Sequence, residues 1–122
     1  INECANGLGL NEIGLDRDVS ELSGGQRAKV LLAKLLLEKK LTLATAESCT
    51  GGLVSSLITD ISGASEFFRG SVCAYTNEMK MNLLGIPQEL LDTYGAVSAE
   101  CAEELSRAAC RKFGTDAGIG VT

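Results

Sequence analysis

Ser48 is the residue of this 122-residue chain whose type and setting most directly suggest covalent chemistry. It follows a short apolar run, Leu41 to Ala46, and precedes two glycines, Gly51 and Gly52. A serine between a buried strand and a helix is where α/β folds expose a nucleophile, and glycine amides beside it could bind an oxyanion or a phosphate. The same residues are also typical of an ordinary strand–turn–helix with capping hydroxyl groups, so both interpretations stay open at this point.

A second glycine-rich segment could bind an anion. Ser23, Gly24, Gly25 and Gln26 precede a long run of good helix formers. Backbone amides at a helix N-terminus attract negative groups, and the Ser23 hydroxyl adds a donor. A plain glycine-rich helix start with Ser23 as its N-cap explains these residues equally well.

Composition excludes several kinds of site. The chain has 16 acidic and 11 basic residues and a net charge of −5, which disfavours binding to nucleic acid or to an anionic membrane. It contains no histidine, so a histidine triad and a histidine-ligated metal are both excluded. We expect neither a metal nor a cofactor. The five cysteines are odd in number and lack paired spacing, which favours reduced thiols in the cytoplasm. The longest apolar runs are too short to span a membrane.

Residue spacing predicts alternating helices and strands. The run from Arg27 to Lys39 is a strong helix, whose apolar face is expected to comprise Ala28, Leu31, Leu32, Leu35 and Leu36. Further helices are expected around 54–61, over 79–84, from Pro87, and from Ser98 to about Phe113. Strands are expected near 41–47, 70–76 and 117–121. This order predicts an α/β fold with three layers, α/β/α, around a short and mostly parallel sheet.

The N-terminal segment resembles a known ATPase motif. Residues 11–34, with Leu-Ser-Gly-Gly-Gln at their centre, are similar to the signature segment of ABC-type ATPases, especially the ABC-F branch. The resemblance implies that Ser23, Gly24, Gly25 and Gln26 contact ATP held by an opposite subunit. The chain has no phosphate-binding loop of the G-x-x-x-x-G-K-[ST] type, and Ala46 stands at the position of the family's metal-orienting Asp. We therefore expect no ATP hydrolysis.

The remaining residues resemble a different family. Thr45-Ala46-Glu47-Ser48-Cys49-Thr50-Gly51-Gly52 is followed in order by Phe68-Arg69-Gly70, Ala74-Tyr75-Thr76-Asn77-Glu78-Met79-Lys80, Leu84-Gly85-Ile86-Pro87 and Tyr94-Gly95-Ala96-Val97-Ser98. These blocks are similar to the CinA C-terminal domain, the nicotinamide-nucleotide amidohydrolase family. The resemblance implies a bacterial cytoplasmic enzyme that converts nicotinamide mononucleotide to nicotinate mononucleotide and ammonia.

The resemblance also assigns roles to single residues. Ser48 matches the nucleophile, Lys80 the basic residue and Tyr75 its aromatic partner. A lysine can replace histidine as the base that takes the serine proton. The expected substrate-side residues are Glu47, Thr50, Gly51, Gly52 and Arg69. Of these, Glu47 and Thr50 would orient the turn, and Arg69 is either a phosphate contact or a surface charge.

Together the two resemblances predict a chimera, with a boundary between residues 1–38 and 39–122. Relatives of the second part continue beyond Val121-Thr122, so we expect a truncated amidohydrolase domain that is inactive by itself. A folded scaffold without activity and an ABC-type ATP-binding fragment are the alternatives. A three-stranded sheet leaves an unpaired edge, which predicts a homo-oligomer or marginal stability.

Overall fold

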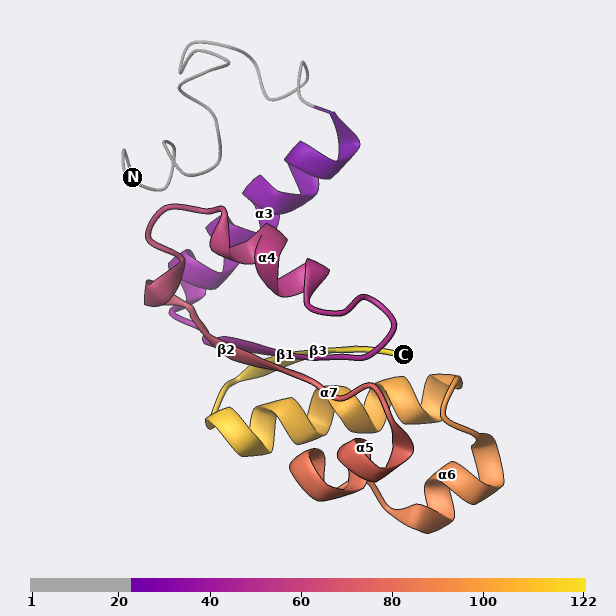
Figure 1. Cartoon of the computed structure of the whole chain (residues 1–122). Coiled ribbons are helices and arrows are strands. Elements are labelled where there is room, and N and C mark those ends of the chain that lie inside the picture. The colour runs from indigo at the N-terminus through magenta and orange to yellow at the C-terminus, as the bar shows by residue number, and fades with distance from the viewer. Residues whose placement is uncertain (1–22) are drawn as a thin grey trace, which may run out of the picture.

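The computed structural model describes residues 23–122 and forms three layers around a central sheet (Figure 1). One face of the sheet carries helices α3 and α4, and the opposite face carries α5, α6 and α7. In chain order the elements are α3 (Gly24–Lys39), β1 (Leu43–Glu47), α4 (Leu53–Thr59), the 3-10 turn η2 (Ala64–Glu66), β2 (Phe68–Cys73), α5 (Asn77–Leu84), α6 (Gln88–Tyr94), α7 (Ala99–Phe113) and β3 (Ala117–Val121).

The three strands are parallel, in the order β2-β1-β3. At the end of the central strand, Glu47 is paired with Cys73 on one side and with Val121 on the other. The carboxyl ends of all three strands therefore meet at one edge of the sheet. These features confirm the predicted α/β fold class.

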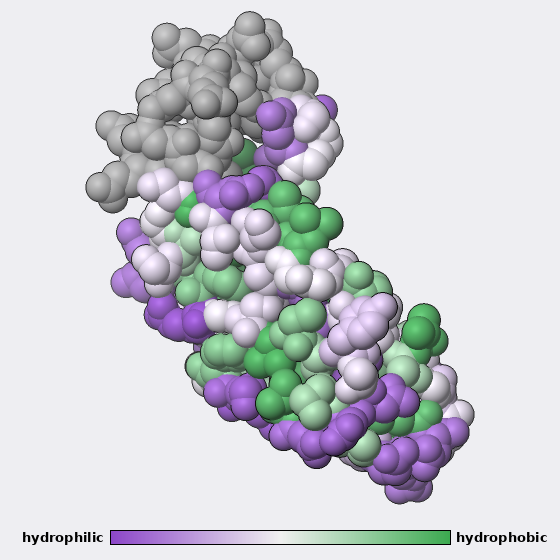
Figure 2. Space-filling view, viewed as in Figure 1, coloured by the Kyte–Doolittle hydropathy of each residue, from purple (hydrophilic) through white to green (hydrophobic). Residues whose placement is uncertain are grey.

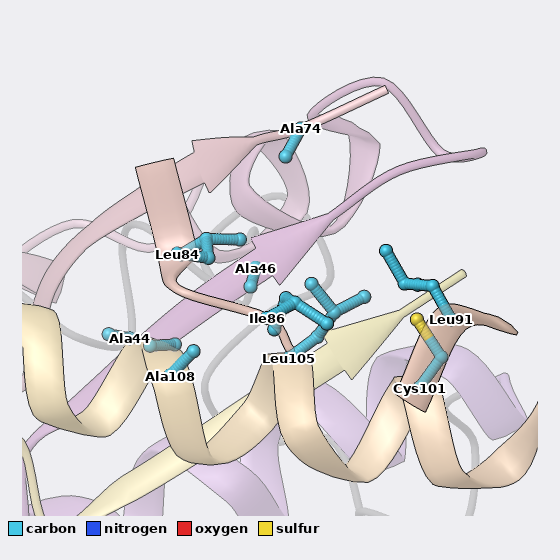
Figure 3. Close-up of a cluster of buried hydrophobic side chains, with 10 residues drawn as sticks. Ala44, Ala46, Ala74, Leu84, Ile86, Leu91, Cys101, Leu105 and Ala108 are labelled. Carbon is cyan, nitrogen blue, oxygen red and sulfur yellow. The ribbon is translucent and has the colours of Figure 1, made fainter. Parts of the chain in front are cut away.

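Strand β1 is buried along its whole length, because helices cover both of its faces. Ala44 and Ala46 pack with Leu105, Ala108 and other side chains of the α5–α6–α7 layer (Figure 3). Leu43 packs on the other face, in a cluster that includes Leu36 and Phe67. The small alanines let α7 lie close to the centre of the sheet.

Helix boundaries follow the local signals in the sequence. The Ser23 hydroxyl accepts from the amide of Gln26, and the Gln26 side chain accepts from the amide of Ser23, which together form a capping box. Thr76 and Ser98 cap α5 and α7 through their hydroxyl groups alone, which accept from the amides of Met79 and Cys101.

The predicted buried face of α3 is wrong in part. Leu31 and Leu35 are 60% and 51% exposed, whereas Ala33 and Leu36 are buried against α4 and η2 in the core. The helix carries apolar side chains on most of its circumference, so spacing alone does not decide which of them face the sheet.

Candidate active site

Ser48 and Lys80 meet at the carboxyl edge of the sheet. Ser48 directly follows β1, and Lys80 lies in the first turn of α5, which begins shortly after β2 ends. Lys80 Nζ donates a hydrogen bond to Ser48 Oγ over 3.0 Å. Both residues are buried, with 5% and 2% of their surfaces exposed. The carboxyl edge of parallel strands is where α/β folds form their sites, and this pair has the geometry of a nucleophile and its base.

Among residues 23–122, Lys80 Nζ has two hydrogen-bond acceptors, and both are uncharged oxygen atoms. The second is the backbone carbonyl of Tyr75, 3.4 Å from Nζ. Burial of an ammonium group without a carboxylate partner is costly, and such groups gather at functional sites. The Tyr75 side chain is 74% exposed, so the contact with Lys80 is made by backbone and not by the phenol.

Glu47, the last residue of β1, is fully buried and points toward α4. Its Oε1 accepts from the Thr50 hydroxyl over 2.7 Å and from the Val54 amide over 2.9 Å. Its Oε2 accepts from the Ser55 amide over 2.9 Å and from the Ser55 hydroxyl. Burial raises the pKa of the Glu47 carboxyl, but the hydrogen bonds from Ser55, Thr50 and Val54 outweigh burial, and the net pKa lies below its ordinary value.

These contacts use both oxygens of Glu47 inside the protein, at the turn that Glu47 is expected to orient. They also bring in Ser55, which was not predicted as a site residue. The Ser55 hydroxyl lies 2.8 Å from the Thr45 hydroxyl as well. The signal available in the sequence was Gly52, since a helix that starts after glycine needs a capping group from elsewhere.

The turn from Ser48 to Gly52 is tight. Gly51 donates its amide to the Ser48 carbonyl over 3.1 Å. Gly51 and Gly52 have φ values of 61° and 101°, a left-handed region that favours glycine. Thr50 is held against Glu47 by its hydroxyl. The predicted residues Thr50, Gly51 and Gly52 thus lie together beside Ser48.

Arg69 lies at the other end of the sheet. It is near the start of β2, where Phe68 pairs with Leu43 at the amino end of β1. Its guanidinium donates to the Ser65 carbonyl over 2.8 Å. The structure therefore does not bring Arg69 to Ser48, and the surface-charge interpretation fits its position.

The Ser23–Gln26 turn is occupied by its own cap, since the side chains of both end residues bond to each other's backbone. A cavity of about 430 Å³ adjoins Gly25 and Gln26. Most of its wall consists of apolar side chains such as Leu32, Val54 and Ile119, which would not bind a phosphate. The remainder of the ATPase-like segment, residues 11–22, lies outside the described residues.

Residues 23–122 contain four of the five cysteines. Within that range, Cys49, Cys73, Cys101 and Cys110 are free thiols; Cys4 lies outside it. No cluster of acidic or cysteine side chains there could hold a metal ion. No helix in that range is long and apolar enough to cross a membrane.

Comparison with known proteins places these features in a family. Residues 26–122 match the family described as the CinA C-terminal domain. A CinA-like protein of Dictyoglomus turgidum is 46% identical over 92 residues, and one of Flavobacterium psychrophilum is 48% identical over 94 residues. These stretches cover 75% and 77% of this chain but only 22% of either relative, so the chain spans about a fifth of their length.

Solved structures agree with this match. A CinA superfamily protein of Escherichia coli superposes with a TM-score of 0.74 at 28% identity, over 83% of this chain and 60% of that one. The competence damage-inducible protein A of Klebsiella pneumoniae gives 0.71 at 30% identity, over 74% and 56%. The family match begins at residue 26 and so includes most of α3. The chain belongs to the CinA C-terminal domain family.

Proposed function

We propose that Ser48 and Lys80 are the nucleophile and the general base of an amidohydrolase centre that acts on the carboxamide of a pyridine nucleotide. The 3.0 Å hydrogen bond between Ser48 Oγ and Lys80 Nζ, buried at the carboxyl edge of the sheet, carries this proposal. Within this family the reaction proposed is the conversion of nicotinamide mononucleotide to nicotinate mononucleotide and ammonia.

The proposed chemistry needs only these two side chains and water. Lys80 in its neutral form takes the proton of Ser48 Oγ, and the oxygen attacks the carboxamide carbon. When the tetrahedral intermediate collapses, the C–N bond breaks and the leaving nitrogen takes the proton from Lys80, so ammonia departs. Water then attacks the resulting ester with Lys80 as base, and the proton returns to Ser48 as nicotinate mononucleotide leaves.

We propose that four further residues support Ser48 and Lys80: Thr50, Gly51, Gly52 and Tyr75. The turn at Thr50, Gly51 and Gly52 places backbone amides beside Ser48, and the Tyr75 carbonyl orients the Lys80 ammonium. An ATP-binding role for residues 23–26, and a separate origin for residues 1–38, stay predictions. The capping box at Ser23 does not support the ATP-binding role. A family match that begins at residue 26 does not support the separate origin.

Covalent labelling tests the nucleophile without requiring a complete substrate pocket. A fluorophosphonate should phosphonylate Ser48, with fluoride as the leaving group, and mass spectrometry of the peptide should locate the adduct. We expect Lys80→Met to slow labelling by about 100-fold, the range of general-base catalysis, and Ser48→Ala to abolish it. Lys112→Met, an exposed lysine of α7, is the matched control and should label at the normal rate.

Equal labelling of the wild type and Lys80→Met would overturn the role of Lys80 as the base. A wild type without any label on Ser48 would instead favour a folded scaffold without activity. The substrate is tested separately by incubating the protein with nicotinamide mononucleotide and measuring ammonia. Release that Ser48→Ala abolishes supports the pyridine nucleotide.

A further inference from the structure

Glu47 caps a helix that cannot cap itself. Gly52, the N-cap residue of α4, has no side chain to accept the first amides of the helix. The two carboxylate oxygens of Glu47 take those amides instead, one from Val54 and one from Ser55, each over 2.9 Å. The cap therefore comes from the end of β1, across the Ser48–Gly52 turn.

This arrangement fixes the turn that carries Ser48. Glu47 is bonded covalently to Ser48 on one side and holds the start of α4 on the other. The Thr50 hydroxyl ties the middle of the turn to the same carboxylate over 2.7 Å. Between these anchors the turn has little freedom to move Ser48 Oγ relative to Lys80, which reaches the site from α5 in the other layer.

We propose that Glu47 is a positioning residue for the nucleophile: its carboxylate, as the cap of α4, keeps Ser48 Oγ within hydrogen-bond distance of Lys80 Nζ. The inference rests on the proposed roles of Ser48 and Lys80. Glu47 is fully buried and cannot touch substrate, so its effect passes through the turn. Displacement of a reacting group by about 1 Å can cost about 100-fold in rate.

The test compares Glu47→Gln and Glu47→Asp with the wild type by the kinetics of fluorophosphonate labelling at Ser48. Gln places an NH₂ group against amides that need an acceptor. We expect it to lower the maximal labelling rate by about 10- to 100-fold with an unchanged half-saturating concentration. Asp keeps the charge on a shorter side chain and should recover part of the rate.

Asp116→Asn is the matched control. Asp116 also accepts from a backbone amide and a hydroxyl, those of Thr42, each over 2.8 Å, but at the amino end of β1. Its variant should lose stability without losing labelling at Ser48. Normal labelling in a folded Glu47→Gln protein, or an equal loss in Asp116→Asn, would overturn the inference. If Glu47→Gln does not fold, Thr50→Val is tested in its place, because it removes one hydrogen-bond donor from the Glu47 carboxylate. Thr50→Val should also lower the labelling rate. A normal rate in this variant would overturn the inference.

A second readout separates this inference from the proposed function. Hydrogen exchange at the Val54 and Ser55 amides reports the cap directly. If wild-type Ser48 is not labelled, the proposed function fails. Faster exchange at these two amides in Glu47→Gln, but not in Asp116→Asn, would still show that Glu47 positions the turn. Unchanged exchange there would overturn the cap itself.

Discussion

At the residue scale, the candidate site consists of the Ser48–Lys80 pair and of several groups that hold this pair in place. Ser48 and Lys80 could be predicted from the sequence because they stand in ordered blocks with a recognisable resemblance. The resemblance also implies that Glu47 orients the turn, but its cap on the α4 amides could not be predicted, because it depends on where the first turn of α4 lies. Tyr75 shows the same limit: its position beside Lys80 follows from the chain, but the direction of its side chain, 74% exposed, does not.

The same scale yields a prediction for stability against pH. The pKa of Glu47 in the folded protein lies below its ordinary value of 4.5, despite burial, because of the hydrogen bonds from Ser55, Thr50 and Val54. A group of this kind stabilises the fold fully above its ordinary pKa, and the contribution is lost as the pH falls through the lower, folded value. Urea denaturation should therefore show the wild type losing stability from about pH 5 downward.

Glu47→Gln should lose less stability over that interval, because the titrating group is gone. The pKa of Asp116 is also lowered, by hydrogen bonds from the backbone and side chain of Thr42, and Asp116 is present in both proteins. The difference between the two curves thus isolates Glu47. Parallel curves for the wild type and Glu47→Gln would contradict the prediction.

At the element scale, the helices and strands follow from capping and spacing, whereas their contacts do not. Ser23 and Ser98 can be predicted as caps because a hydroxyl before a helix can accept one of its first amides. Thr76 also caps a helix, although the sequence predicts a strand near 70–76 and a helix that begins only at residue 79. The buried side of α3 depends on α4 and η2, which lie later in the chain. Leu31 and Leu35 belong to the expected apolar face and are nevertheless exposed.

The packing of α7 on β3 gives a prediction for this scale. A Cβ atom at Gly120 would lie 2.0 Å from the Ala102 carbonyl oxygen and 2.6 Å from the Ser106 amide nitrogen, both backbone atoms of α7. Because the backbone cannot move aside as a side chain can, Gly120→Ala should lower the free energy of unfolding by about 3 kcal/mol. Chemical denaturation measures this loss. Gly24→Ala, which meets no atom within 4 Å, should change it by less than about 0.5 kcal/mol.

At the scale of the whole molecule, each face of the sheet has a buried cluster, and the α3–α4 layer also has several exposed leucines. Helices α5, α6 and α7 enclose a buried cluster against the sheet. On the opposite side, Leu31 and Leu35 of α3 and Leu53 and Leu57 of α4 have 43% to 60% of their surfaces exposed. Figure 2 shows apolar side chains on this part of the surface. Within the described residues, the outer edges of β2 and β3 also have no strand beside them.

These two features predict that copies of the chain associate through the α3–α4 surface, because large exposed apolar areas and open strand edges favour association. Sedimentation velocity over a range of concentrations should show a dimer or larger species. Leu31→Glu combined with Leu35→Glu should shift it toward monomer without unfolding α3, since neither side chain is in the core. Leu83→Glu, 43% exposed on α5 in the other layer, is the control and should leave the association unchanged. A wild type that stays monomeric at every concentration and melts in one sharp two-state transition would contradict the prediction.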